Sequence, residues 1–495
     1  MTAVDAASVV EAEERTLRPA ASARPLAWLR ERGMGASILV AALSSAFAVV
    51  LMSVTSFLAL VMRSDPYLGD SGLLAFILSF LTVLLVGVAV YVAAIVTANT
   101  FATVVAGRTR QIALLRLIGA SATAERSKVA RQGLIVGAIG ALIGLVAGTV
   151  LSVVGADVAV RTLGLTLENV EATIVQPALL LPAVVVALTT WAAAWAGSRR
   201  VLAVTPLQAL GGSVEVTHES VVGRTRRNVG AIVLFVAGAL FLAGGIVVGL
   251  VSPLGVAIAF VGGILSFTGL TLGATLVMPP VLRLVGRLFG GSATARLAAE
   301  NALRYPERSS RMAIGVVMGV TLVTMFAVAL ESVKAFIVAS ADGQPVSDIV
   351  GLLDTFSAIM MALVAVSAVI AAVGLVNLLT IGVVQRRREL GLLRALGMSN
   401  AQVRRMVLLE AAHVTIASLV AGLVLGIAYG WAGAQSLLGS VAMPPNWAAP
   451  TFVLPAVPLW PVVAVIGATA VLTLVAAVVP TRLATRVAPV AALAE

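Results

Sequence analysis

Long apolar stretches separated by short polar segments run through the whole chain. Each stretch holds about 20 residues or more, the length that an α-helix needs to cross the hydrocarbon core of a membrane. The pattern lacks the short alternating segments that are typical of membrane β-barrels. We therefore predict an all-α polytopic membrane protein with about ten transmembrane helices, at residues 36–62, 73–105, 133–155, 177–197, 230–250, 254–277, 312–336, 356–384, 407–430 and 457–480.

One basic segment between apolar runs occurs twice in the chain. Residues 385–410 read QRRRELGLLRALGMSNAQVRRMVLLE, and residues 108–132 read RTRQIALLRLIGASATAERSKVARQ. The two copies align without a gap at a constant shift of 278, so that Gly119 falls on Gly397. A repeat of this kind indicates that the architecture is duplicated.

The repeat extends over four spans in each half. Met34 and Met312 begin equivalent spans at the shift of 278, and Pro206 and Pro489 follow the last spans at a shift of 283. An even number of spans separates equivalent points, so both halves cross in the same direction and form a parallel repeat. The predicted 4+2+4 plan has a cytoplasmic leader with an interfacial helix at 1–33, a first four-helix unit at 34–210, a linker with two transmembrane helices at 211–294 and a second four-helix unit at 295–495.

The repeated segment predicts two helices joined at a sharp corner. Leucines recur three apart from Leu390 to Leu396 and form one apolar stripe among strong helix formers. Gly397 then ends the helix, because glycine tolerates the positive φ that follows a helix end. Ser399 can cap the next helix, and Gln402 completes a capping box. The first copy keeps the glycine and the serine but has alanine in place of the glutamine.

Composition agrees with a membrane protein and narrows the chemistry. The chain is 60% hydrophobic and only 11% charged, with a mean hydropathy of +1.08. Without cysteines and with only two histidines, it has no thiolate chemistry and no histidine-based metal cluster. The net charge of +11 does not indicate a nucleic-acid partner, because the basic residues lie at the ends of apolar runs.

Charge along the chain predicts the orientation in the membrane. With the N-terminus inside, all but three of the 33 basic residues lie on the inner side, the exceptions being Arg63, Arg161 and Lys334. The outer segments carry mainly acidic residues, so the positive-inside rule indicates N-in and C-in. Residues 20–32 and residues 295–305 are predicted as interfacial helices before the first span of each unit.

Catalytic signatures are absent from the sequence. There is no GxxxxGK[ST] loop, HExxH or GxSxG motif, so we expect a non-catalytic chain with no cofactor of its own. His413 is expected to be a packed or interfacial side chain. The predicted spans have no charged residue at their centres, which argues against an ion-coupled transporter. Their weak dipoles are expected to form hydrogen bonds between helices; these residues are Ser44, Ser45, Ser53, Thr55, Asn99 and Asn377.

The sequence RRRELGLLRALGMSNAQVRRMVLLE resembles the signature of FtsX-like permease domains in ABC transporters of the MacB superfamily, and RQIALLRLIGAS is a more divergent version. The 4+2+4 plan is similar to the ten-span permeases of the bacitracin-exporter type. Members of this family often carry a large external domain between the first two spans of a unit, whereas here residues 63–72 and 335–355 form short loops. Peptide sensing, lipoprotein extraction or hydrolase activation would therefore need a separate extracytoplasmic protein, or would take place within the spans.

The resemblance implies a permease subunit in the bacterial plasma membrane, in contact with membrane lipids. A separate cytoplasmic ATPase, in two copies, would hold ATP and Mg²⁺ and drive export or extraction of an amphiphilic substrate such as a lipid, lipopeptide, antimicrobial peptide or drug. The expected ATPase-docking residues come from both copies; they are Ile112, Leu115, Arg116, Ile118, Gly119, Leu390, Leu393, Arg394, Leu396 and Gly397.

Two other classes of function remain open. In a mechanotransmitting signalling module, ATP hydrolysis would regulate a cell-wall enzyme or a sensor partner without moving a solute. A secondary transporter would instead act on an ion gradient with no ATPase present. The first alternative predicts that a protein partner, rather than a cargo, stimulates the ATPase.

Overall fold

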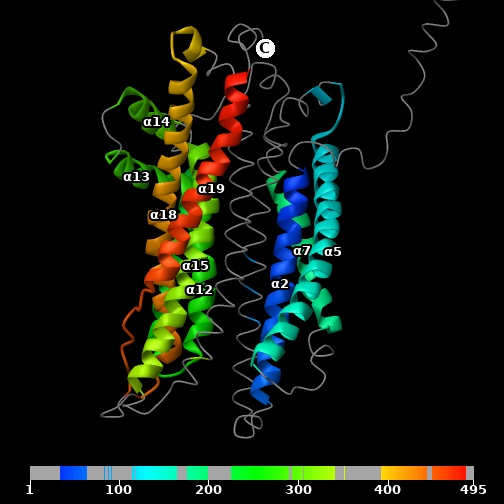
Figure 1. Cartoon of the computed structure of the whole chain (residues 1–495), viewed down its shortest axis with the longest axis vertical. Coiled ribbons are helices and arrows are strands. Elements are labelled where there is room, and N and C mark those ends of the chain that lie inside the picture. The colour runs from blue at the N-terminus through cyan, green and yellow to red at the C-terminus, as the bar shows by residue number, and fades with distance from the viewer. Residues whose placement is uncertain are drawn as a thin grey trace, which may run out of the picture.

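The computed structural model of the chain is a bundle of long helices (Figure 1). Every regular element among the described residues is helical, as the apolar pattern predicts. The structure describes residues 34–63, 83, 87, 91, 114–115, 118–163, 175–198, 225–288, 292–304, 306–340, 351, 392–442 and 449–486.

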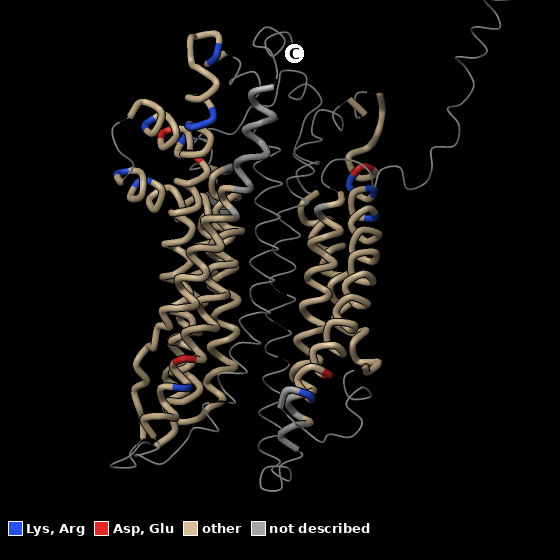
Figure 2. The backbone as a smooth tube through the Cα atoms, viewed as in Figure 1, with Lys and Arg blue, Asp and Glu red and all other residues tan. Residues whose placement is uncertain are grey.

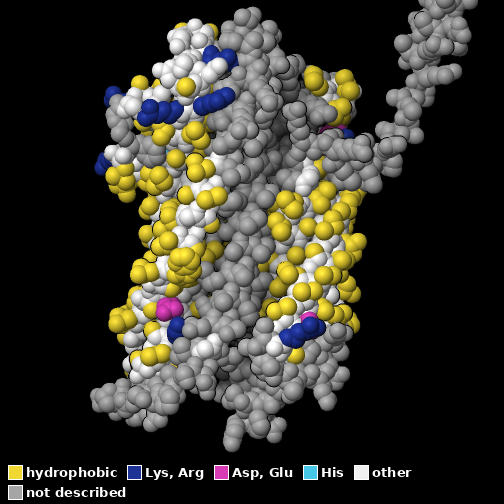
Figure 3. Space-filling view, in the orientation of Figure 1, with side chains coloured by type: hydrophobic (Ala, Val, Ile, Leu, Met, Phe, Trp, Pro, Cys, Tyr) yellow, Lys and Arg dark blue, Asp and Glu magenta, His cyan; other side chains and the backbone are white. Residues whose placement is uncertain are grey.

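The helices are apolar around most of their circumference, as expected for helices that face both protein and lipid. Hydrophobic side chains accordingly cover much of the sides of the molecule in Figure 3, with charged side chains towards its two ends. In chain order the elements are α2 (Met34–Arg63), α5 (Ala122–Leu163), η2 (Pro177–Leu179), α7 (Leu180–Gly197), α11 (Thr225–Gly249), α12 (Gly255–Leu272), α13 (Ala274–Gly286), α14 (Ala293–Arg304), α15 (Pro306–Ser340), α18 (Asn400–Leu438) and α19 (Leu459–Arg486).

Seven of the ten predicted spans are confirmed by helices that are long and apolar enough to cross a membrane. The predicted span at 457–480 coincides with α19, whose described apolar stretch is Leu459–Val471. The spans predicted at 73–105 and 356–384 lie outside the described residues, apart from three positions in the first of them. The seven confirmed segments are Ser37–Phe57, Ala122–Arg161, Pro177–Gly197, Asn228–Gly249, Gly255–Leu272, Met312–Ser340 and Asn400–Leu438.

The two halves share a helix crossing. α2 crosses α5 in the first half as α15 crosses α18 in the second, with small residues at the contact. A Cβ at Gly148 would lie 3.0 Å from Val49 Cβ, and one at Gly426, the equivalent position in the repeat, would lie 2.5 Å from Thr324 Cβ. Such glycines let helix backbones approach closely in a membrane. α5 and α18 both begin at the upper end of Figure 1, as a parallel repeat requires.

α11 and α12 form a tight hairpin that packs against the second half. A Cβ at Gly238 of α11 would lie 2.5 Å from Ser266 Cα of α12, so glycine is needed for this approach. On the opposite side of the contact, the Ser266 hydroxyl lies 2.6 Å from the Tyr429 hydroxyl of α18. The Tyr91 hydroxyl also lies 2.8 Å from Thr268 Oγ1. α12 therefore contacts residues of both halves.

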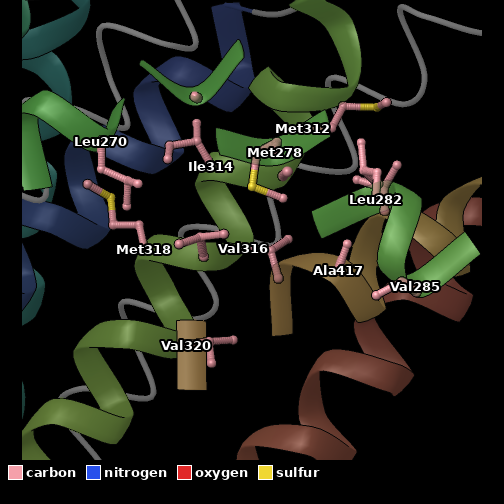
Figure 4. Close-up of a cluster of buried hydrophobic side chains, with 14 of the residues drawn as sticks. Leu270, Met278, Leu282, Val285, Met312, Ile314, Val316, Met318, Val320 and Ala417 are labelled. Atoms are coloured by element: carbon pink, nitrogen blue, oxygen red, sulfur yellow. The ribbon is translucent and has the colours of Figure 1, made fainter. Parts of the chain in front are cut away.

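Among the described residues, a large apolar core lies where α12, α13, α15 and α18 meet (Figure 4). Leucine and methionine side chains from α13 fill the space between the other helices, and Leu282 is fully buried. This core fastens α13 to the membrane bundle near the beginning of α18. Its labelled members are Leu270, Met278, Leu282, Val285, Met312, Ile314, Val316, Met318, Val320 and Ala417.

The end of α12 differs from the sequence prediction. The predicted span at 254–277 ends earlier, at Leu272, and the chain turns at Gly273 before α13 begins. The apolar run continues through this turn, so hydropathy alone does not mark it. The helix predicted at 295–305 is confirmed as α14, and its interfacial position stays a prediction. The helix predicted at 20–32 lies outside the described residues.

The hydroxyl groups in the spans follow the predicted role only in part. Ser45 Oγ donates a hydrogen bond of 2.9 Å to the Ala141 carbonyl of α5, as predicted. Thr55 instead bonds to carbonyls of its own helix, and the Ser44 and Ser53 hydroxyls have no hydrogen-bond partner among the described residues. A hydroxyl can reach the carbonyl four residues back in its own helix, which competes with bonds between helices. Asn99 and Asn377 lie outside the described residues.

Charged side chains mark the two faces of the membrane. Most described lysines and arginines gather at the upper end of Figure 2, where α5 begins on one side and α18 begins beside α13 and α14 on the other. The last turn of α5, at the opposite end, carries the ion pair of Arg161 and Asp157 at 2.9 Å. This arrangement agrees with the predicted orientation, and we refer to the basic end as the inner face.

Candidate docking site

Two sharp corners precede the long helices α5 and α18 at the inner face (Figure 1). We call residues 114–121 the first corner and residues 392–399 the second corner. Gly119 and Gly397 have φ angles of 106° and 101°, and they are the only glycines with positive φ among the described residues. A side chain would be strained in this conformation, so the chain needs glycine at both corners.

The same backbone hydrogen bonds close both corners. The N–H of Ala120 donates to the Leu115 carbonyl at 2.9 Å, and the N–H of Met398 donates to the Leu393 carbonyl at 3.0 Å. This bond from the second residue after a helix end is typical of the Schellman motif that follows a helix. The two corners therefore have matching local geometry at equivalent positions of the repeat.

Serine side chains begin the helices after the corners, as the sequence predicts. Ser399 accepts a hydrogen bond of 3.2 Å from the N–H of Gln402, whose side-chain oxygen accepts one of 2.9 Å from the N–H of Ser399. This is a complete capping box. Ser121 accepts a hydrogen bond of 3.1 Å from the N–H of Ala124, but the returning bond of the box is missing, since alanine lacks the side-chain oxygen.

Each corner presents an apolar side chain to its surroundings. Ile118 is 82% exposed and Leu396, its equivalent in the repeat, is 76% exposed. Leu114 and Leu392, one turn earlier, are about half exposed. The sequence prediction left this second pair out of the docking set, although the repeat aligns the two residues. The two corners thus expose apolar side chains at equivalent positions of the repeat.

The opposite side of the second corner packs against its own chain. Leu393 and Met398 are partly buried against Ala298 of α14 and against Val403 and Met406 in the first turns of α18. Leu115 has the equivalent position in the first corner and is also partly buried. This packing connects the second corner to both α14 and the beginning of α18.

A different contact holds the beginning of α5, just after the first corner. The Arg126 guanidinium lies 4.0 Å from the centre of the Trp195 ring at the inner end of α7. Arg126 also donates a hydrogen bond of 3.4 Å to the Trp195 carbonyl. A cation over an aromatic face adds about 0.5 to 1 kcal/mol at an exposed site. Trp195 was not among the predicted site residues, because nothing in the sequence links it to a position so much earlier in the chain.

Two buried polar residues lie on α18 below the second corner. Glu410 accepts a hydrogen bond of 2.9 Å from the side-chain amide of Asn301 on α14. One turn further on, His413 Nε2 lies 2.7 Å from the Leu282 carbonyl of α13. His413 is fully buried, which confirms the prediction that it is a packed side chain. The two bonds connect α13 and α14 to the helix that the second corner begins.

The structure places seven of the ten predicted docking residues. Ile118 and Leu396 are exposed, Gly119 and Gly397 form the turns, and the remaining three lie at the sides or on the packed face. Those three are Leu115, Leu393 and Arg394, each partly exposed. Ile112, Arg116 and Leu390 lie outside the described residues.

Neither corner has the side chains of a metal or catalytic site. No group of three or more histidine, cysteine, aspartate or glutamate side chains capable of holding a metal ion occurs among the described residues. Each corner presents an exposed apolar residue beside a glycine turn. The second corner also packs against α14 and α18. Such an arrangement suits a helix that fits into a groove of a partner protein.

Comparison with known protein families identifies the same duplicated region. The family described as FtsX-like permease C-terminal matches the chain twice, at residues 83–206 and 361–489, together about half of its length. The starts of the two matches are related by the shift of 278, and their ends by the shift of 283. These are the two shifts that relate the halves of the sequence, and each matched segment contains one corner.

A curated relative points to the same kind of protein. The chain is 35% identical over 66 residues to the ABC transporter permease YtrF of Bacillus subtilis (strain 168). This alignment covers 13% of the present chain and 15% of the relative. The chain thus matches only a short part of the length of that permease.

Proposed function

Because the chain belongs to the FtsX-like permease family, we propose that it is the membrane-spanning subunit of an ABC transporter, driven by a separate ATPase at the inner face. The duplicated corner is the observation that carries this proposal. Two copies of one turn, each with an exposed apolar side chain, lie at the same end of the bundle. Two matching docking elements suit a pair of identical ATPase subunits, which would hold ATP and Mg²⁺.

In this proposal the exposed residues make the direct contact. Ile118 and Leu396 enter an apolar groove on each ATPase subunit, where their burial adds about 1.5 to 3 kcal/mol apiece. Arg116 and Arg394 pair with acidic residues at the rim of the groove. Leu393 belongs to the packed side of its corner and holds the corner on α14 and α18. Gly119 and Gly397 set the angle between the short helix and the long one.

The long helices suit the transmission of movement to the outer side. α18 continues without interruption for 39 residues after the second corner, and α5 for 42 residues after the first. At 1.5 Å per residue, each helix is about 60 Å long, which exceeds the thickness of a membrane. Closure of the ATPase pair would therefore displace the outer ends of both helices as rigid levers.

The proposed cargo is amphiphilic: a lipid, a lipopeptide, an antimicrobial peptide or a hydrophobic drug. The lateral surfaces of the helices are covered by apolar side chains, and the described centres of the spans carry hydroxyl groups rather than charges (Figure 3). A hydrated ionic solute would lose its water against such walls at a large cost. The apolar part of an amphiphile would stay in an apolar environment during the whole of its passage.

Co-purification tests the docking proposal. We expect an ATPase of the ABC type to accompany the wild-type chain from native membranes and to be lost from the double variant Ile118→Asp, Leu396→Asp. Both side chains are exposed, so aspartate is tolerated in the fold but not in an apolar groove. Leu288→Asp is the matched control, since Leu288 is 80% exposed near the end of α13 outside both corners. An ATPase that remains bound to the double variant would refute docking at the corners.

A second experiment separates transport from signalling. In a purified complex in lipid vesicles, a transporter predicts that an amphiphilic cargo stimulates ATP hydrolysis in the absence of other proteins. A mechanotransmitting module predicts that only an extracytoplasmic or sensor protein does so. The double corner variant should abolish either response, which links the stimulation to this chain.

A further inference from the structure

An extended segment connects the outer end of α18 to α19. We call residues 451–458 the outer strap. It forms no helix, although it lies between two long helices and runs along the side of the bundle in Figure 1. Its first residue is fastened to the end of α18, because the N–H and hydroxyl of Thr451 donate hydrogen bonds of 2.8 Å to the carbonyls of Gly439 and Val441.

Buried side chains of α18 and α15 hold the strap in place. Gln435 is 1% exposed and bonds twice: its amide donates to the Thr451 carbonyl at 2.9 Å and its oxygen accepts from the N–H of Val453 at 2.7 Å. The Trp431 indole donates to the Val453 carbonyl at 2.8 Å. Side chains of α18 therefore bond to the backbone of the strap at Thr451 and Val453.

Proline and one serine account for further backbone groups of the strap. Pro455 and Pro458 have no N–H to satisfy, and the N–H of Ala456 donates to Ser332 Oγ of α15 at 3.1 Å. A polar backbone group without a partner costs several kcal/mol where water is scarce. Prolines and side-chain acceptors are therefore the features that an extended chain needs in order to lie against lipid.

The outward side of the strap is strongly apolar. Phe452 is 65% exposed and Leu454 is 74% exposed, whereas Val453 between them points inward and is 4% exposed. Leu459 and Trp460, at the beginning of α19, are 81% and 79% exposed. Residues 449–460 contain no charged side chain, which contrasts with the polar rim of an interface between soluble proteins.

The contacts of the strap also indicate how deep it lies in the membrane. Ser332 lies next to Glu331 and two residues before Lys334, the charged pair that marks the outer end of the membrane-spanning part of α15. It lies eight residues before the end of α15, about 12 Å along the helix. The strap therefore descends from the outer ends of the helices to the level where the hydrocarbon begins, and Trp460 has the position of an interfacial tryptophan.

We propose that the outer strap is a lipid-binding surface that inserts Phe452, Leu454 and Trp460 into the headgroup region and upper acyl chains of the outer leaflet. Through Gln435 and Ser332 the strap fastens the outer ends of α18 and α15 to that leaflet. This role is independent of the ATPase: it depends on the orientation in the membrane and not on what the permease carries.

Spin labels on the strap test the proposal, and the chain is suited to them because it contains no cysteine. The full chain is reconstituted in vesicles of phosphatidylcholine and phosphatidylglycerol with one labelled cysteine at a time. Labels at Phe452→Cys and Leu454→Cys are expected to collide several-fold more with oxygen than with a nickel chelate, since oxygen concentrates in lipid and the chelate in water. The label at Asp157→Cys, on the outer end of α5, should show the opposite ratio.

Two control variants help to interpret the collision measurements. A label at Val453→Cys should collide little with either reagent, because this position faces Gln435. Gln435→Leu should raise the mobility of the label at Leu454→Cys and its collisions with the nickel chelate. The proposal is overturned if labels at positions 452 and 454 meet the chelate as readily as the label at 157. It is also overturned if the labels at positions 452 and 454 are shielded from the chelate in native membranes but not in the vesicles, since a protein would then cover the strap.

Discussion

The side-chain amide of Asn301 on α14 donates a hydrogen bond of 2.9 Å to Glu410 on α18, and the carboxylate is almost fully buried. This bond lies about three turns beyond the second corner, in the inner part of α18. Together with the packing of Leu393 on Ala298, it makes α14 part of the support of the corner. Both interactions connect an interfacial helix to the segment that we propose as a docking element.

Replacement of Asn301 should therefore loosen this support. Asn301→Leu removes a hydrogen bond to a buried charged group, and we expect the free energy of unfolding to fall by about 1 to 3 kcal/mol. Glu410→Gln keeps an oxygen that accepts from Asn301 and should change stability much less. Thermal unfolding of the purified protein in detergent measures both. Equal losses in the two variants would contradict a specific role of the bond.

Glycine at the crossing of α15 and α18 is predicted to be essential for packing. Gly426→Val places atoms against Thr324, where even a Cβ would lie only 2.5 Å from Thr324 Cβ, and overpacking of this kind costs about 1 to 3 kcal/mol. Gly433→Ala in the same helix is the control, because a Cβ there meets no atom within 4 Å. It should be neutral or slightly stabilising, since alanine favours helix. The unfolding temperatures of the two variants test this prediction.

The repeat makes the same prediction in the first half. Gly148→Val should destabilise the crossing of α2 and α5, where a Cβ would lie 3.0 Å from Val49 Cβ. Gly155 is the repeat equivalent of Gly433, and a Cβ there also meets nothing within 4 Å. Gly155→Ala should therefore leave the unfolding temperature almost unchanged. A large loss from Gly155→Ala would indicate that the two crossings are not equivalent.

The turn glycine of the second corner should be sensitive for a different reason. Gly397→Ala meets no atom within 4 Å, yet the φ of 101° is unfavourable for any residue with a Cβ. We expect this strain to cost about 1 to 2 kcal/mol. The corner can relieve the strain by changing the angle between the short helix and α18. Co-purification of the ATPase should therefore fall. Gly315→Ala on α15, where φ is ordinary and no atom lies within 4 Å, should leave the ATPase bound.

The two helix caps should differ in strength. Ser399→Ala removes a complete capping box and should weaken the first turn of α18 by about 1 kcal/mol. Amide hydrogen exchange at residues 400–403 reports this change directly. Ser399→Thr, which keeps the hydroxyl, should restore most of the protection. Ser121→Ala should accelerate exchange at the start of α5 less, because only one of the two bonds of the box exists there.

The repeated sequence was sufficient to predict the local geometry of the corners. Glycine followed two residues later by serine predicts a turn with positive φ and a capped helix, and both corners have that geometry. These features depend on close neighbours along the chain, so the sequence contains all of the interacting partners. Long apolar runs likewise predicted the seven confirmed spans, because helix formation in lipid follows from the need to satisfy the backbone.

Contacts between segments that are far apart in the sequence could not be predicted from the sequence in this way. The sequence placed Leu393 among the docking leucines, and only the fold shows that it packs on Ala298 while Leu396 remains exposed. The turn at Gly273 was hidden in a continuous apolar run. Trp195 meets Arg126 although the two lie far apart in the sequence, a relation that no periodicity encodes.

The sequence by itself determined that this is a duplicated helical membrane protein with two inner corners, because length, hydropathy and local turn chemistry act on neighbouring residues. Tertiary structure decided which face of each corner is free and which is packed. It also decided that Gln435 and Ser332 hold residues 451–458 as an extended strap. Those outcomes depend on which side chains meet across the bundle, and that is settled only when the helices pack against one another.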